Sequence, residues 1–136
     1  MIIVDTNVIV YLYVQGKKSA DAKKLLQIDS DWIVPPLWIS EFRNAVIQTA
    51  RHGVITFVDA EEFTLDALKF LEHRTIKPNS KIVINLAQNS NCSAYDCEFI
   101  ALAQSLNTKL ITVDKRVLRN FPQIAIELTT YINQNQ

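Results

Sequence analysis

The stretch that decides the fold is residues 2–14, Ile-Ile-Val-Asp-Thr-Asn-Val-Ile-Val-Tyr-Leu-Tyr-Val. Its first three residues form a short apolar run that ends at Asp5, which predicts a buried strand. From Thr6 to Val14 the apolar residues recur at helical spacing, so a turn and a helix are expected next. The chain therefore begins as strand, turn and helix, with an acidic residue at the junction.

The rest of the chain continues this alternation. Further strands are predicted at 32–34 and 109–113, and helices at 20–27, 37–52, 59–71, 81–88 and 95–106, before a short helical turn and a last apolar stretch at 124–128. Pro35-Pro36 ends the second strand, and Gly53 suits a helix C-terminus. Asp59 with Glu62 predicts a capping box, and Ser80 predicts an N-cap. Strands separated by helices favour right-handed crossovers, so the class is α/β with a mostly parallel sheet.

Length and composition predict one domain over residues 1–136. The chain has 49% hydrophobic and 21% charged residues, enough to bury a core, and its two glycines and four prolines mark no linker. The apolar N-terminus contains Asp5 and lacks a basic leader, which argues against a signal peptide. No apolar run is long enough to cross a bilayer, so we expect a cytoplasmic protein without a membrane partner.

The net charge and the two cysteines exclude few classes of function. The formal net charge is zero, with 14 basic and 14 acidic residues, which counts mildly against an RNA substrate although a local basic patch can still serve. Cys92 and Cys97 are expected to remain thiols in a reducing compartment. Zinc is disfavoured, because neither His52 nor His73 stands at a spacing that completes a ligand set.

Two acidic residues directly follow predicted strands. Asp5 and Asp114 each come at the end of an apolar run, and ligands of open parallel sheets bind beyond the carboxyl ends of the strands. Both side chains are therefore expected in one crevice. The alternative is that each aspartate only caps the helix that follows it.

Two further acids lie on predicted helices. Asp96 shares a face with Phe99 and Ile100 and is expected to face the interior, where an ionised carboxylate requires a cation or several donors. The alternative is a capping box with Ser93. Glu41 lies at the edge of an apolar stripe, and the alternative for it is a solvated glutamate in the first helical turn.

If the four acids converge, their mutual repulsion favours a hard divalent cation. Oxygen donors suit Mg²⁺ or Mn²⁺, which lower the pKa of bound water and stabilise charge on a phosphoryl oxygen. Asp5, Glu41, Asp96 and Asp114 are thus candidate metal ligands and catalytic residues for phosphodiester hydrolysis. No Ser/His/Asp or Cys/His arrangement competes with them.

Read together, four motifs resemble the PIN-domain family, and within it the VapC-type toxins of type II toxin–antitoxin systems. They are Val4-Asp-Thr-Asn7, the Ser40-Glu41 helix, Tyr95-Asp-Cys-Glu-Phe-Ile-Ala-Leu-Ala103 and Thr112-Val-Asp-Lys-Arg116. The resemblance runs from Met1 to about Leu128. It implies an α/β/α sandwich, a Mg²⁺- or Mn²⁺-dependent ribonuclease that cleaves RNA, a homodimer and a VapB-like antitoxin partner.

The resemblance also implies roles for single residues. Asp5 and Asp96 would be the principal metal ligands, and Glu41 and Asp114 would complete the site directly or through water. Asn7, Ser93 and Thr112 would support these acids. Lys115, Arg116 and Arg119 are candidate phosphate contacts, although a solvated basic turn is the more common role of such residues.

Other function classes fit less well. A haloacid-dehalogenase-like phosphatase needs a second acid two residues after the first, where this chain has Asn7. A receiver-like phosphoacceptor needs an acidic pair near its first strand, which is also a poor match. The remaining alternative is a catalytically inactive PIN-like interaction module.

Overall fold

The computed structural model describes all 136 residues and has an α/β architecture. In chain order its elements are β1 (Ile2–Val4), α1 (Thr6–Tyr13), α2 (Ser19–Ile28), β2 (Trp32–Ile33), α3 (Leu37–Arg51), α4 (Phe57–Leu71), α5 (Ser80–Gln88), α6 (Ala94–Ser105), β3 (Leu110–Thr112), α7 (Lys115–Asn120), β4 (Ala125–Glu127) and α8 (Leu128–Asn135). None of these helices is long and apolar enough to cross a membrane.

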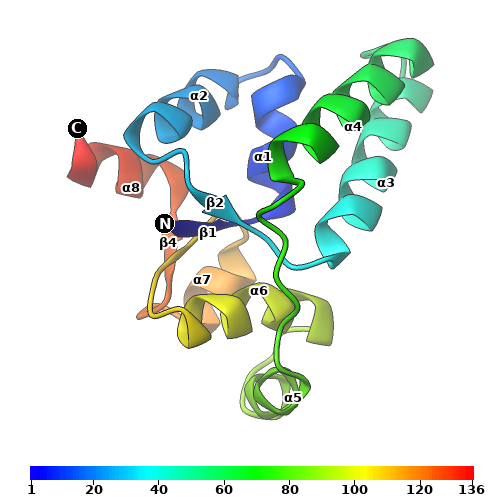
Figure 1. The fold of residues 1–136 in the computed structure, drawn as a ribbon. Coiled ribbons are helices and arrows are strands. Elements are labelled where there is room, and N and C mark those ends of the chain that lie inside the picture. The colour runs from blue at the N-terminus through cyan, green and yellow to red at the C-terminus, as the bar shows by residue number, and fades with distance from the viewer.

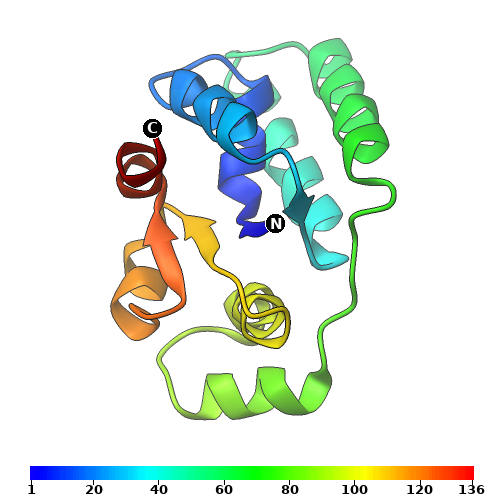
Figure 2. The ribbon, with the colours of Figure 1, turned by 60° about the vertical axis from the view of Figure 1, so that its left-hand side comes forward.

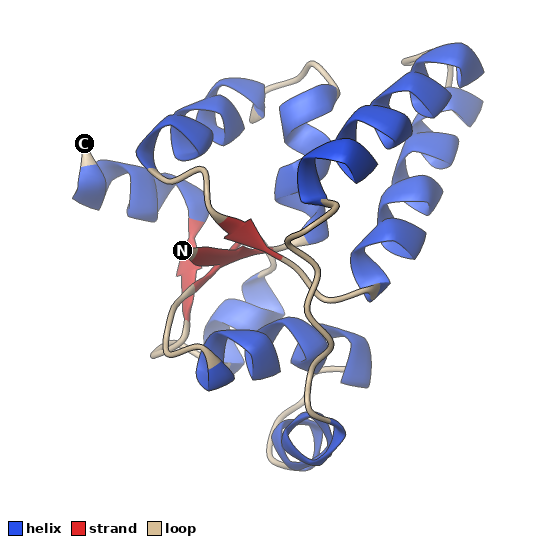
Figure 3. Ribbon diagram, in the orientation of Figure 1, coloured by secondary structure: helices blue, strands red, loops and turns tan.

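The four strands form one parallel sheet in the order β2-β1-β3-β4 (Figure 3). Ile3 pairs with Ile33 on one side and with Leu110 on the other, so β1 is central. The chain leaves β1 for β2 on one side and later returns to β3 on the other. The strand order therefore reverses at β1 and β3, and such a switch point opens a crevice at the carboxyl ends of the strands.

Helices cover both faces of the sheet, which makes three layers (Figures 1 and 2). Helices α1 to α4 lie on one side with α8 against α2, while α6 and α7 lie on the other side with α5 packed outside α6. All residues of β1 and β3 are buried, as expected for a parallel sheet covered on two faces. The predicted α/β/α sandwich is confirmed.

Helix boundaries follow local signals, with two corrections. The capping box of α4 is formed by Thr56 and Asp59, not by Asp59 and Glu62, because the helix already begins at Phe57. The N-cap of α5 is Asn79, whose side chain accepts from the Ile82 amide, so Ser80 is the first helical residue. Gly53 has a φ of +76° just beyond α3, as predicted for a helix end.

The C-terminal region is only partly as predicted. The strand predicted at 109–113 is shorter, at Leu110–Thr112, and the apolar stretch at 124–128 contains β4. Helix α8 was not predicted; Glu127 caps it by accepting from the Thr130 amide. Leu128 and Ile132 of α8 are buried and so close the core beside β4.

Candidate functional site

Asp5 and Asp114 follow β1 and β3, the two neighbouring strands at the switch point. The Asp5 amide donates to the Ile111 carbonyl at 3.0 Å, which continues the β1–β3 pairing to the first residue past the strand. Asp114 follows Thr112, the last residue of β3, by two positions. Because the strands are parallel and adjacent, both acids emerge at the same edge of the sheet, as the sequence predicts.

Asp5 is half-buried and both of its carboxylate oxygens accept hydrogen bonds. The Thr6 amide donates to Oδ1 at 2.8 Å, which makes Asp5 the N-cap of α1. The Thr112 hydroxyl donates to Oδ2 at 2.5 Å. Thr112 is fully buried, and its oxygen also accepts from the Asp114 amide at 3.1 Å. Thr112 therefore connects the two strand-end acids and fixes their relative position.

Asp114 caps α7 through a single oxygen. Its Oδ1 accepts from the amides of Arg116 at 2.9 Å and Val117 at 3.2 Å. Its Oδ2 has no hydrogen bond to the protein. The capping role therefore leaves one oxygen of the same side chain without a protein hydrogen bond.

Asp96 lies in the first turn of α6 and is half-buried. It forms a capping box with Ser93: the Ser93 hydroxyl accepts from the Asp96 amide at 3.1 Å, and Asp96 Oδ2 accepts from the Ser93 amide at 3.3 Å. The capping alternative is thus present, and it leaves Oδ1 without a hydrogen bond to the protein. The negative charge at the N-terminus of α6 is favourable to the helix dipole.

Glu41 is the fourth acid and is also half-buried. Its Oε1 accepts from the Thr6 hydroxyl at 2.7 Å, and Thr6 is itself 4% exposed. Helix α3 begins at Leu37, so Glu41 lies past its first turn. The alternative of a solvated first-turn glutamate is wrong. Thr6 links Asp5, through its amide, to Glu41, through its hydroxyl.

The four acids influence one another electrostatically. Burial raises the pKa of Asp5, the hydrogen bonds from Thr112 and Thr6 oppose this, and the charges of Asp114 and Asp96 raise the pKa further. Burial likewise raises the pKa of Glu41, against the hydrogen bond from Thr6 and with the charges of Asp5 and Asp96. The acids from four segments therefore share one region of negative potential.

No basic side chain neutralises this region. The ion pairs of the chain involve Asp29, Asp31 and Glu72, and none involves the four candidate acids. Glu41, Asp96 and Asp114 each keep one oxygen free of protein hydrogen bonds. Hard oxygen donors with uncompensated charge are the chemistry that Mg²⁺ and Mn²⁺ prefer. No three of these groups are close enough in their present rotamers to hold a single ion.

The other residues named from the sequence lie as follows. Thr112 contacts Asp5 and Ser93 contacts Asp96, whereas Asn7 is exposed and makes no side-chain hydrogen bond to the protein. Lys115, Arg116 and Arg119 are exposed on α7, directly after Asp114. Cys92 and Cys97 are free, buried thiols, and burial raises the pKa of both.

Sequence reasoning missed two residues of the site. Thr6 was assigned only to the helix, although a threonine directly after a strand-end aspartate is placed to donate from both amide and hydroxyl. Glu98 is half-buried two positions after Asp96, and its charge raises the pKa of Glu41. Glu98 is an added fifth acid of the region, and no local signal in the sequence marks it.

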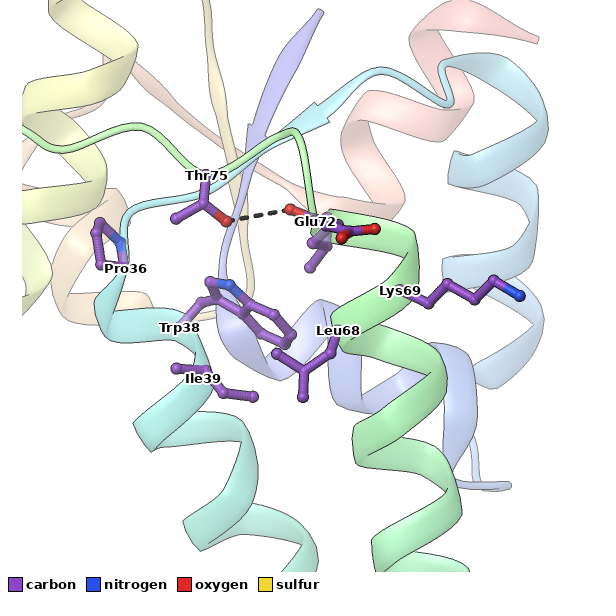
Figure 4. A pocket seen from close by; sticks show the side chains of 8 residues that line it. Pro36, Trp38, Ile39, Leu68, Lys69, Glu72 and Thr75 are labelled. Carbon is purple, nitrogen blue, oxygen red and sulfur yellow. Dashed lines mark hydrogen bonds between the residues drawn. The ribbon is translucent and has the colours of Figure 1, made fainter.

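An apolar cavity lies apart from the four acids. It measures about 560 Å³ and lies between the start of α3 and the end of α4 (Figure 4). Trp38, Ile39 and Leu68 line it, and Thr75, whose hydroxyl donates to the Leu71 carbonyl, lies at its edge. Its lining is mainly apolar, which distinguishes it from the acidic crevice.

The sheet order, the switch-point acids and the sequence define the class of protein. The PIN domain model matches residues 2–125, nearly the whole chain, and the chain belongs to the PIN-domain family.

Individual relatives agree with this assignment. The chain is 23% identical over 126 residues to Ribonuclease VapC3 of Pyrobaculum aerophilum, a match that covers 90% of this chain and 96% of that protein. Among solved structures, PAE2754 from Pyrobaculum aerophilum has the same fold, with a TM-score of 0.77 at 21% identity over 98% of this chain and 94% of that one. FitAB, solved bound to an IR36 DNA fragment, aligns with a TM-score of 0.68 at 17% identity, over 94% and 95%.

Proposed function

We propose that this protein is a Mg²⁺- or Mn²⁺-dependent ribonuclease, the toxin of a VapBC-type toxin–antitoxin pair. The observation that carries the proposal is the set of four half-buried carboxylates from four chain segments with no basic partner. Membership of the PIN-domain family and the similarity to Ribonuclease VapC3 support the choice of RNA as substrate.

In this proposal Asp5 and Asp96 are the principal metal ligands, and Glu41 and Asp114 complete the site directly or through water. A bound divalent cation would lower the pKa of a water molecule and stabilise charge on the phosphoryl oxygen during in-line displacement. Thr112 holds the Asp5 carboxylate and Thr6 holds that of Glu41, so both acids are oriented before a ligand arrives. Asp114 and Asp96 each keep one oxygen free of protein hydrogen bonds while the other oxygen caps a helix.

The RNA backbone needs positive charge near this acidic centre. Lys115, Arg116 and Arg119 are exposed on the helix that Asp114 caps, and we assign phosphate contacts to them. This local cluster would compensate for the zero net charge of the whole chain.

The partners are part of the same proposal. A VapB-like antitoxin or a second copy of the chain would each bind to apolar surface that this chain exposes. Val54, Phe57, Val58 and Leu65 expose from 58% to 65% of their surface around the α3–α4 connection and along α4. Such exposure of large apolar side chains near one another is typical of a protein interface.

The test is cleavage of a panel of single-stranded and structured RNAs by protein purified away from any bound antitoxin. We expect cleavage with Mg²⁺ or Mn²⁺ and none with EDTA. Loss of a residue that only supports a metal ligand costs about 10- to 100-fold, so Asp5→Asn and Asp96→Asn should cost at least about 100-fold. Glu62→Gln, an exposed acid on α4, is the matched control and should retain full activity.

One observation favours a second candidate, a catalytically inactive PIN-like interaction module. Asp5, Asp96 and Asp114 all make capping hydrogen bonds, so folding alone is a reason to have them. Absence of metal-dependent cleavage across the whole RNA panel would select this alternative. Equal cleavage by the wild type and the two aspartate variants would instead show that the acids named here are not the site.

A further inference from the structure

A second pocket adjoins the acidic crevice. It measures about 420 Å³ and lies between α5 and α6, which pack against each other on the outer side of the sheet (Figure 1). Its lining includes Lys77 before α5, Ile84 on α5, and Tyr95 and Glu98 on α6. Of these residues only Glu98 was also described at the carboxylate site.

The pocket borders the proposed catalytic centre through Glu98. Tyr95 and Glu98 line the pocket, whereas Asp96, which lies between them in the sequence, points from a different face of α6. Tyr95 and Glu98 are three positions apart in one helix and therefore lie on the same face. Glu98 is also close enough to Glu41 for its charge to act on that acid. A ligand that spans the acids can therefore extend into the pocket without leaving the surface.

The chemistry of the lining selects the occupant. Tyr95 is 63% exposed and Ile84 is 66% exposed, so an aromatic ring and an apolar side chain stand open to solvent. Lys77 is exposed and forms no ion pair, while the half-buried carboxylate of Glu98 is a hydrogen-bond acceptor. A flat ring, an acceptor and a cation together match a nucleotide, which has a stacking face, N–H donors and a phosphate.

We propose that this pocket binds one unpaired base of a single-stranded RNA, next to the phosphodiester held at the carboxylates. Tyr95 stacks on the base, Glu98 accepts a hydrogen bond from an amino or imino group on its edge, and Lys77 contacts the adjoining phosphate. Single-stranded RNA is preferred because only unstacked bases can turn outward onto an aromatic side chain. The proposal rests on the ribonuclease function and adds a determinant of base preference to it.

Binding is tested first in EDTA, where no cleavage is expected, with a fluorescently labelled single-stranded RNA of about ten nucleotides. Loss of one base–aromatic stack costs about 1–3 kcal/mol, so Tyr95→Ala should raise Kd by about 5- to 150-fold. Tyr95→Phe keeps the ring and should restore binding. Leu68→Ala removes another exposed apolar side chain, 40% exposed on α4, and should leave Kd unchanged. An unaltered Kd for Tyr95→Ala overturns the proposal.

Cleavage kinetics separate this proposal from the ribonuclease function. Tyr95→Ala should raise KM and leave kcat nearly unchanged, whereas Asp5→Asn should abolish kcat. Glu98→Gln should alter the preference among bases, since an amide also donates hydrogen bonds. If the wild type binds RNA through Tyr95 but does not cleave it, the proposed ribonuclease function is wrong and the proposed base pocket is supported. A Tyr95→Ala variant that cleaves RNA like the wild type, and differs only in oligomeric state, would assign the pocket to a protein interface instead.

Discussion

Replacing Thr112 by valine tests the physical basis of the acidic crevice. Valine has nearly the shape of threonine, so the fully buried position stays filled while the hydroxyl is lost. Two hydrogen bonds disappear: the one donated to Asp5 Oδ2 at 2.5 Å and the one accepted from the Asp114 amide at 3.1 Å. The Asp5 carboxylate and the Asp114 amide then lack these partners.

The magnitude follows from the type of each bond. A hydrogen bond to a charged acceptor contributes about 1.5–3 kcal/mol and a neutral one about 1 kcal/mol, so Thr112→Val should lower the free energy of unfolding by about 3 kcal/mol. For a domain of this length that corresponds to a fall in Tm of about 10 °C. The cost of Thr112→Val should shrink as pH falls through the raised pKa of Asp5. A protonated Asp5 is a weaker hydrogen-bond acceptor, so removal of the Thr112 hydroxyl costs it less free energy.

The assay is urea denaturation in EDTA at several pH values. Thr112→Ser keeps the hydroxyl and removes one methyl group, so it should cost only about 1 kcal/mol. In an Asp5→Asn background the cost of Thr112→Val should fall from about 3 to about 2 kcal/mol, since the bond to a charged acceptor becomes a neutral one. A cost of Thr112→Val no greater than that of Thr112→Ser, or an equal cost in both backgrounds, would show that the Thr112 hydroxyl does not stabilise the Asp5 carboxylate.

Four further outcomes are expected. Asp5→Asn should stabilise the metal-free protein, because the pKa of Asp5 is raised in the folded state and its ionisation therefore lowers stability. The gain should be absent in acid, below the unfolded pKa of about 3.8, and should grow as pH rises through the folded pKa, as pH-dependent denaturation will reveal. Mg²⁺ or Mn²⁺ at 100 times its Kd should add about 2.7 kcal/mol to wild-type stability, and calorimetry should detect no such gain in Asp5→Asn. Phe42→Ala should cost about 3–5 kcal/mol in denaturant, because Phe42 is fully buried against the rings of Tyr13 and Trp38; a cost under about 1 kcal/mol would contradict its core position. Gly53→Ala should cost about 1 kcal/mol from backbone strain at φ +76° alone, as nothing lies within 4 Å of the added methyl; an unchanged Tm would argue against that backbone conformation.

The parts of the fold that sequence predicts are those set by local signals. The apolar run at Ile2–Val4 and the helical spacing after it depend on neighbours in the chain, and both elements are found there. Helix α8 was missed because its N-cap is Glu127, a residue that rarely marks a helix start. The capping box of α4 was predicted at Asp59 and Glu62, but Thr56 and Asp59 form the same motif three residues earlier.

The candidate site is predictable only in outline. Asp5 and Asp114 could be placed together because parallel strands end at the same edge of a sheet. The contact between Thr6 and Glu41 spans 35 positions and depends on how α3 packs against α1, which no local pattern encodes. For the same reason the role of Glu98 beside the pocket became visible only with the helices in place.

The caps formed by Asp5 and Asp114 bear on how this chain could change over generations. Asparagine and serine cap helices about as well as aspartate, but they carry no charge. A single substitution to either residue at these two positions would keep α1 and α7 intact while removing the charge that a cation needs. Loss of the proposed catalysis and loss of folding are therefore separable in this chain. One such substitution would leave a descendant protein folded but without the proposed nuclease activity.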